Sequence, residues 1–104
     1  MILIVEDDAD LVETYVDLLE AKGYATMSAS SAADAIQLAV STEPLIVILD
    51  LGLSGSSGTR VLDFIRGYKP LENTRILVVT GHSETTDPRF LAIGPVEQAD
   101  FVLT

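Results

Sequence analysis

The sequence of 104 residues predicts a single α/β domain in three layers, a doubly wound five-stranded parallel sheet with helices on both faces. Three observations support this class. Short runs rich in Ile, Val and Leu recur without alternating with polar residues, which is typical of strands covered on both faces. Amphipathic helical patterns separate these runs. The length fits one domain, with a core large enough to fold unaided.

Five segments are expected to form the strands. The first, residues 2–5, reads Ile-Leu-Ile-Val. Residues 24–29 alternate apolar and polar side chains, which predicts a strand nearer an edge of the sheet. The other three apolar runs span residues 45–49, 76–79 and 101–103. Each connection between parallel strands is expected to be a right-handed crossover.

The first helix is expected after the first strand. Its apolar residues recur at helical spacing between Leu11 and Leu19 and form one face. Asp8 or Asp10 can cap the start of this helix, because a carboxylate accepts hydrogen bonds from the free amides of the first turn. Gly23 can end it in the left-handed conformation.

Three further helices are expected. Ser31 begins the second, which spans residues 32–40. Thr59 begins the third, with apolar residues facing inward. A fourth lies between residues 83 and 94, where Pro88 interrupts its pattern.

Composition excludes several classes of function. Sixteen Asp and Glu residues face six Lys and Arg residues, for a formal net charge of −10, so direct binding to nucleic acid or an anionic membrane surface is not expected. No apolar run is long enough to span a bilayer, and the first residues do not resemble a secretion signal. The absence of cysteine excludes disulfides and thiolate metal sites. We therefore expect a cytoplasmic protein.

Polar residues that can take part in chemistry follow three of the predicted strands. Glu6 and Asp7 follow the first strand, Asp50 follows the third and Thr80 the fourth. Parallel strands end at one edge of the sheet, where ligands bind, so the carboxylates converge if their strands are neighbours. Carboxylates at such short distances repel one another unless a cation compensates their negative charge. Oxygen ligands beside a phosphate suit Mg²⁺, which predicts magnesium and phosphate chemistry.

Three motifs, ILIVEDD, LIVILDLGLSGSSG and ILVVTGHS, resemble those of the receiver domain of two-component response regulators. Their separations also match, with 43 residues from Asp7 to Asp50 and 30 from Asp50 to Thr80. The resemblance covers nearly the whole chain. It implies the flavodoxin-like strand order 2-1-3-4-5.

The resemblance also implies a role for each matching residue. Asp50 is the expected phosphoacceptor, which takes a phosphoryl group from a sensor histidine kinase or a phosphotransfer protein. Asp7 is the expected direct Mg²⁺ ligand, Glu6 binds the ion through water, and Gly52 contributes its backbone carbonyl. Thr80 is the expected switch hydroxyl. Phosphorylation would then change protein–protein contacts with a downstream partner.

The sequence departs from the family pattern near its end. The resemblance implies a lysine after the fifth strand and then a fifth helix, but the chain ends at Thr104. We therefore interpret residues 1–104 as a receiver domain truncated after its fifth strand. The position of the family's aromatic switch residue is occupied by Val102. Without the fifth helix, one face of the sheet loses its cover, so we expect self-association or reduced stability.

Two other functions are compatible with parts of this pattern. A pseudo-receiver would keep the fold as an interaction module without being phosphorylated, and the missing lysine and Val102 favour it. The intact set of Glu6, Asp7, Asp50 and Thr80 favours a working phosphoacceptor. A phosphatase with an aspartyl nucleophile would need a second acid where this chain has Gly52. We expect no separate enzymatic activity beyond assistance of the domain's own phosphorylation and dephosphorylation.

Overall fold

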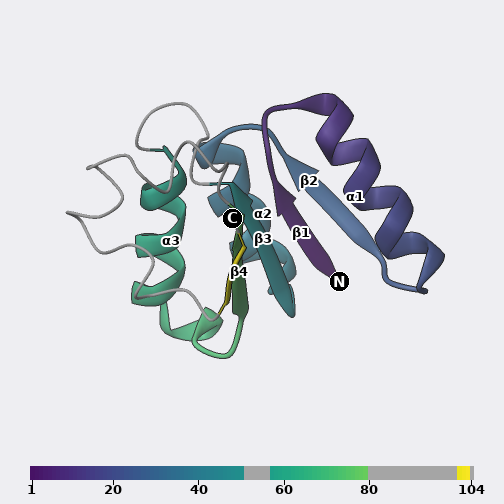
Figure 1. Ribbon diagram of the computed structural model, residues 1–104. Helices are drawn as coiled ribbons and strands as arrows, with labels where there is room; N and C mark the ends of the chain where they lie inside the picture. Colours follow the sequence, from purple (N-terminus) through teal and green to yellow (C-terminus); the bar gives the residue numbers. More distant parts are fainter. Residues whose placement is uncertain (51–56, 80–100, 104) are drawn as a thin grey trace.

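The strands form one parallel sheet in the order β2-β1-β3-β4-β5 (Figure 1), which confirms the predicted fold class and strand order. The computed structural model describes residues 1–50, 57–79 and 101–103. The strands are β1 (Ile2–Val5), β2 (Thr26–Ala29), β3 (Ile46–Asp50), β4 (Arg75–Val79) and β5 (Phe101–Leu103). β2, the strand predicted nearer an edge, lies at one edge of the sheet.

Helices cover the two faces of the sheet unequally (Figure 1). In the described part of the chain, α1 (Ala9–Ala21) packs on one face, whereas α2 (Ala32–Thr42) and α3 (Ser57–Gly67) pack on the other. A short 3-10 helix, η1 (Lys69–Leu71), follows α3. None of the helices in residues 1–50 and 57–79 is both long and apolar enough to cross a bilayer.

Side-chain caps fix the helix starts at the acidic edge. The Asp8 carboxylate accepts a hydrogen bond from the Asp10 amide at 2.9 Å, so Asp8 is the N-cap of α1. The Ser31 hydroxyl accepts one from the Asp34 amide at 3.2 Å and caps α2 as predicted. Gly23 has φ of +91°, the left-handed conformation expected after α1.

Element boundaries differ from the prediction by one or two residues. The edge strand begins at Thr26 rather than at Tyr24, because the Tyr24 amide donates to the Leu19 carbonyl at the end of α1. α3 begins at Ser57 rather than at Thr59. The fourth helix expected between residues 83 and 94 lies outside the described residues.

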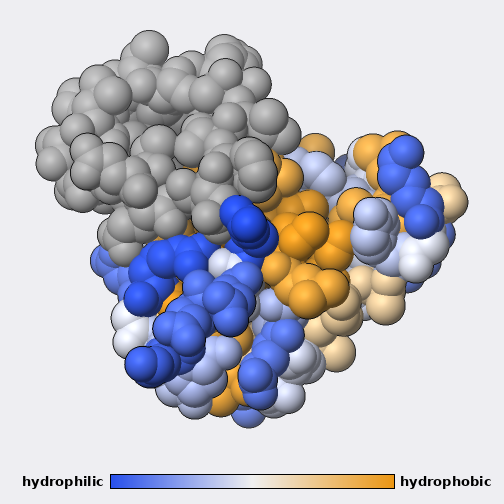
Figure 2. Space-filling model, turned by 90° about the horizontal axis from the view of Figure 1, so that it is seen from below, coloured by the Kyte–Doolittle hydropathy of each residue, from blue (hydrophilic) through white to orange (hydrophobic). Residues whose placement is uncertain are grey.

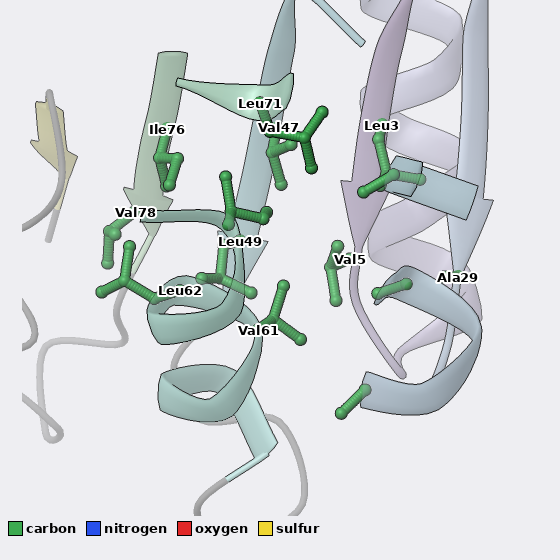
Figure 3. Packing of buried hydrophobic residues seen from close by; sticks show 14 residues of the cluster. Leu3, Val5, Ala29, Val47, Leu49, Val61, Leu62, Leu71, Ile76 and Val78 are labelled. Carbon is green, nitrogen blue, oxygen red and sulfur yellow. The ribbon is translucent and has the colours of Figure 1, made fainter. Parts of the chain in front are cut away.

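Alternation along the strands produces a separate apolar cluster on each face. The larger cluster joins β1, β3 and β4 to α2 and α3. In Figure 3, Val61 and Leu62 of α3 lie against strand residues such as Leu49 and Val78. The smaller cluster packs Ile4 and its neighbours on the sheet against α1. This double cover explains why the strand sequences are continuously apolar.

Among the described residues, the apolar side chains on the α1 face of the sheet are less completely buried than those on the other face. Ile46, Leu77 and Val79 belong to its cluster but are only partly buried. Figure 2, which views the molecule from below, shows a contiguous hydrophobic region with hydrophilic residues on its left and right.

Candidate functional site

The parallel register brings three carboxylates together at the carboxyl edge of the sheet. Val5 pairs with Leu49, so Glu6, the first residue after β1, lies beside Asp50, the last residue of β3. One carboxylate oxygen from each of Glu6, Asp7 and Asp50 can lie within 4.8 Å of the others. The convergence predicted from the strand ends is confirmed.

Burial differs sharply among these acids. Glu6 is 4% exposed, Asp50 is partly buried and Asp7 is exposed. The backbone fixes Glu6 from two sides, because its amide donates to the Ala29 carbonyl at 3.0 Å and its Oε1 accepts from the Asp8 amide at 3.1 Å. Glu6 is therefore the buried and fixed carboxylate of the site, and Asp7 is the carboxylate that faces solvent.

Burial, a hydrogen bond with Asp50 and the negative charge of Asp50 together raise the pKa of Glu6 to about 8, although the hydrogen bond from the Asp8 amide lowers it. Without a compensating cation, Glu6 holds a proton at neutral pH and shares it with the neighbouring carboxylate. The three carboxylates of the cluster therefore cannot all be ionised unless a cation compensates their charge.

This arrangement fits Mg²⁺, judged by the chemistry of its donors. A hard divalent cation prefers carboxylate oxygens and water, and it favours the ionised form that burial of Glu6 opposes. Glu6, Asp7 and Asp50 supply such oxygens at one open edge. No cysteine is present in the chain to favour a softer metal.

A cavity of about 300 Å³ adjoins the acidic cluster between the connections that follow β1 and β2. Its walls come from the ends of both strands and the starts of α1 and α2: Glu6, Asp7, Ala9, Val12, Ser28, Ala29, Ser30 and Asp34. Ser28, Ser30 and Asp34 were not predicted as site residues. The available signal was the run of serines at the end of the second strand and the start of the second helix, at the same edge as Glu6 and Asp7.

Tyr15 belongs to the apolar face predicted for the first helix, and its pKa responds to the acidic cluster. It lies on α1 and packs against the cluster formed by Ile2, Ile4 and Ile48. Burial raises its pKa, and the negative charges of Glu6 and Asp50 raise it further. The negative charges of the two carboxylates therefore favour the protonated phenol of Tyr15.

Several predicted site residues lie outside the described part of the chain. Gly52, the expected carbonyl ligand, and Thr80, the expected switch hydroxyl, are among residues 51–56 and 80–100. Their roles remain predictions. Val102 pairs with Val78 in the sheet.

Comparison with known protein families gives a direct match. The family described as the response regulator receiver domain matches residues 2–97. The acid tolerance regulatory protein ActR of Rhizobium meliloti (strain 1021) is 37% identical over 81 residues, which are 78% of this chain and 41% of ActR. The polar-differentiation response regulator DivK of Brucella abortus (strain S19) is 28% identical over 96 residues, 92% of this chain and 78% of DivK. The chain thus spans less than half of ActR and most of DivK.

Solved structures share the fold. The signal receiver domain of a putative LuxO repressor protein from Vibrio parahaemolyticus has a TM-score of 0.80 at 30% identity, covering 98% of this chain and 75% of that one. The response regulator TrrA of Thermotoga maritima, solved in complex with Mg²⁺-BeF, has a TM-score of 0.82 at 26% identity, covering 99% and 84%. The fold that carries the acidic edge is therefore shared with a response regulator whose structure was solved with Mg²⁺.

Proposed function

Because this chain belongs to the response regulator receiver domain family of two-component signal transduction, we propose that it takes a phosphoryl group onto Asp50 in a Mg²⁺-dependent reaction. The observation that carries the proposal is the gathering of Glu6, Asp7 and Asp50 within 4.8 Å at the carboxyl edge of β1 and β3. The same edge holds the magnesium-type donor set and the expected nucleophile.

Asp50 acts as the nucleophile of the transfer. One of its carboxylate oxygens forms a bond to phosphorus while the bond from phosphorus to the donor's histidine nitrogen breaks, and the imidazole leaves with the bonding electron pair. The product is an aspartyl phosphate and a free histidine. Hydrolysis later returns Asp50 when water replaces it at phosphorus. Neither step needs an oxidant or a reductant.

Glu6 and Asp7 would hold the metal beside Asp50, together with the carbonyl of Gly52. Bound Mg²⁺ supplies positive charge that offsets the negative charge of the phosphoryl oxygens. The fixed position of Glu6, bonded through the Asp8 amide and the Ala29 carbonyl, keeps its carboxylate directed at the site. Thr80 would then hydrogen-bond the new phosphoryl group as the switch hydroxyl.

The partners follow from this chemistry. We infer that the donor is a sensor histidine kinase or a phosphotransfer protein, and that a downstream protein reads the phosphorylated state. Direct binding to nucleic acid or a membrane is not part of the proposal, because the net charge of −10 opposes both. A cytoplasmic location, where kinase domains phosphorylate such partners, is part of it.

Intact mass spectrometry tests the proposal. Wild-type protein is incubated with Mg²⁺ and acetyl phosphate, and one added phosphate that is lost in base is expected. Asp50→Asn is expected to gain none, because it lacks the nucleophile. Asp17→Asn removes an exposed carboxylate of α1 and serves as the matched control, which is expected to react like the wild type.

Chelation of the metal by EDTA is expected to prevent modification of every variant. A folded wild type that binds Mg²⁺ but never gains phosphate would instead support the pseudo-receiver, the interaction module that is not phosphorylated. Modification of Asp50→Asn at the wild-type rate would contradict the assignment of the phosphoacceptor.

A further inference from the structure

We propose that a polar pocket at the amino end of β4 binds a phosphate-type oxyanion between the guanidinium groups of Arg66 and Arg75. This inference goes beyond the proposed function, because the pocket lies at the other end of the sheet from the acidic cluster. The pocket has a volume of about 260 Å³ and is lined by Arg66, Glu72, Asn73, Thr74 and Arg75. Each of these side chains is charged or can form hydrogen bonds.

Positive charge is concentrated at this corner of an otherwise acidic chain. The sequence has six Lys and Arg residues against sixteen Asp and Glu residues, and three of the six, Arg66, Lys69 and Arg75, fall within a stretch of ten residues. They come from the end of α3, from η1 and from the start of β4, which meet at the bottom of Figure 1. Two guanidinium groups line the pocket together with one carboxylate, that of Glu72. This balance of charge favours an anionic ligand.

The backbone holds both arginines in place. Arg66 Nη2 donates to the Thr74 carbonyl at 2.7 Å, which ties the end of α3 to the residue before β4. The Arg75 amide donates to the Leu45 carbonyl at 3.0 Å, so the first residue of β4 is fixed to the segment that leads into β3. A guanidinium has five N–H groups, so a backbone anchor and an oxyanion can share one group.

The turn between α3 and β4 is fixed as well. Thr74 is buried, its hydroxyl donates to the Pro44 carbonyl at 2.9 Å, and its amide donates to the Leu71 carbonyl at 3.0 Å. The Leu71 side chain belongs to the larger apolar cluster. A site that is already ordered loses little conformational entropy when a ligand binds, so these contacts favour binding.

Size and charge select the class of ligand. A volume of about 260 Å³ lies below the range of roughly 300–1,000 Å³ that is typical of pockets for drug-sized ligands, so a small ion or phosphate monoester is expected. The fork of guanidinium N–H groups matches the oxygen atoms of phosphate and carboxylate. A phosphate dianion can neutralise both guanidinium groups, whereas one carboxylate can neutralise only one. We therefore expect phosphate to bind more tightly than acetate.

The pocket is expected to act independently of the acidic cluster. Arg75 pairs with Ile46 and Val79 with Asp50, so the two sites are four residues apart along β3 and β4, or about 13 Å. This separation exceeds the Debye length of about 10 Å at 0.1 M salt. Phosphate binding at the pocket therefore needs no Mg²⁺, and Asp50→Asn is expected to leave it unchanged.

Titration of ¹⁵N-labelled protein followed by nuclear magnetic resonance tests the proposal. Sodium phosphate is added without Mg²⁺ at a mildly alkaline pH, where it is mostly a dianion, and sodium chloride at the same ionic strength is the reference. Saturable shifts are expected for the backbone amides of residues 66 and 72–75. Glycerol phosphate is expected to shift the same amides, and the tighter of the two ligands shows whether the pocket prefers a free ion or a monoester.

Substitutions that change one charge at a time give the expected order of affinities. Arg75→Gln is expected to weaken phosphate binding about 5-fold, the effect of losing one exposed ion pair. Arg66→Lys keeps the charge but loses the fork, so weaker binding is expected. Glu72→Gln removes a repelling charge and is expected to strengthen binding. Lys22→Gln changes a cation at the end of α1 and is the matched control, expected to bind like the wild type. Circular dichroism checks that each variant is folded.

Three results would overturn the proposal. Equal shifts in phosphate and in chloride would show that ionic strength alone causes them. Unchanged phosphate affinity in both Arg75→Gln and Arg66→Lys would exclude the two guanidinium groups as ligands. Equal affinity for acetate and phosphate would contradict the preference for a dianion. A chain that gains no phosphate on Asp50 would overturn only the proposed function, because this titration uses neither Mg²⁺ nor a phosphodonor.

Discussion

Glu6 is the residue at which folding and function conflict. Its side chain is 4% exposed and lies beside Asp50, so burial and the neighbouring charge both favour a protonated carboxyl. Metal binding needs the ionised form instead. The chain thus keeps a buried acid whose preferred state in the absence of metal is the wrong one for the proposed reaction.

Stability without metal is expected to fall as pH rises, because the folded pKa of Glu6, about 8, exceeds its ordinary value of 4.5. A raised pKa means that the folded state binds the proton more tightly than the unfolded state. Its contribution is therefore fully present below pH 4.5 and is lost as pH rises toward 8. Chemical denaturation in EDTA is expected to show a loss of about 2–3 kcal/mol, since water at the open edge reduces the full effect.

Glu6→Gln provides the control, because glutamine keeps the shape and cannot ionise. It is expected to flatten the pH dependence of the unfolding free energy in EDTA. Added Mg²⁺ is expected to stabilise the wild type more at pH 8 than at pH 5, since the ion binds the ionised carboxylate. A wild type equally stable at both pH values in EDTA would contradict the assigned environment of Glu6.

The acidic cluster could be predicted from the sequence, whereas the environment of Tyr15 could not. Glu6, Asp7 and Asp50 follow apolar runs, and parallel strands place such residues at one edge. Tyr15 falls at a helical position where an apolar pattern counts an aromatic ring as core. The raised pKa of Tyr15 depends on its burial against β1 and β3 and on the charges of Glu6 and Asp50, which the helical pattern does not encode.

At the scale of elements, the capping residues determine where helices begin. Ser31 has the extended backbone of an N-cap, and its hydroxyl accepts from the Asp34 amide at 3.2 Å. α2 brings buried alanines, such as Ala35 and Ala39, into the larger cluster, so fraying of its first turn also loosens the core. The cap therefore contributes to packing as well as to the helix.

Replacing the cap by Ser31→Ala is expected to lower the free energy of unfolding by about 1 kcal/mol, because one amide of the first turn loses its acceptor. Urea denaturation measures the change. Ser41→Ala in the last turn of the same helix is the matched control. The Ser41 hydroxyl is exposed and only donates to the Leu38 carbonyl at 3.3 Å, so an effect within about 0.5 kcal/mol is expected. Equal losses in both variants would contradict the capping role.

Differences between predicted and observed elements have local hydrogen-bonding causes. The second strand starts late because the Tyr24 amide is already bonded to Leu19. η1 was not predicted, since its Lys-Pro-Leu sequence contains a proline and is too short for a helical pattern. Such contacts depend on how the chain meets the preceding helix, which hydrophobic periodicity does not encode.

At the scale of the whole molecule, the two faces of the sheet are unequal. In the described part of the chain, α2 and α3 cover one face, but α1 alone packs on the other. Three apolar side chains of that second face, Ile46, Leu77 and Val79, stay partly exposed. Exposed apolar surface on a sheet favours association, whereas a net charge of −10 on each copy opposes it.

These opposing forces predict self-association that grows with salt. Ions screen the repulsion between copies, with a Debye length of about 10 Å at 0.1 M, while apolar contact persists. Sedimentation velocity is therefore expected to show mostly monomer at low ionic strength and an increasing dimer fraction at high ionic strength. The double variant Leu77→Thr/Val79→Thr keeps strand-forming residues and is expected to remain monomeric in both. Val40→Thr, at a 38% exposed position on α2, is expected to associate like the wild type. A wild type that stays monomeric at every salt concentration would show that the α1 face is sufficiently covered as it stands.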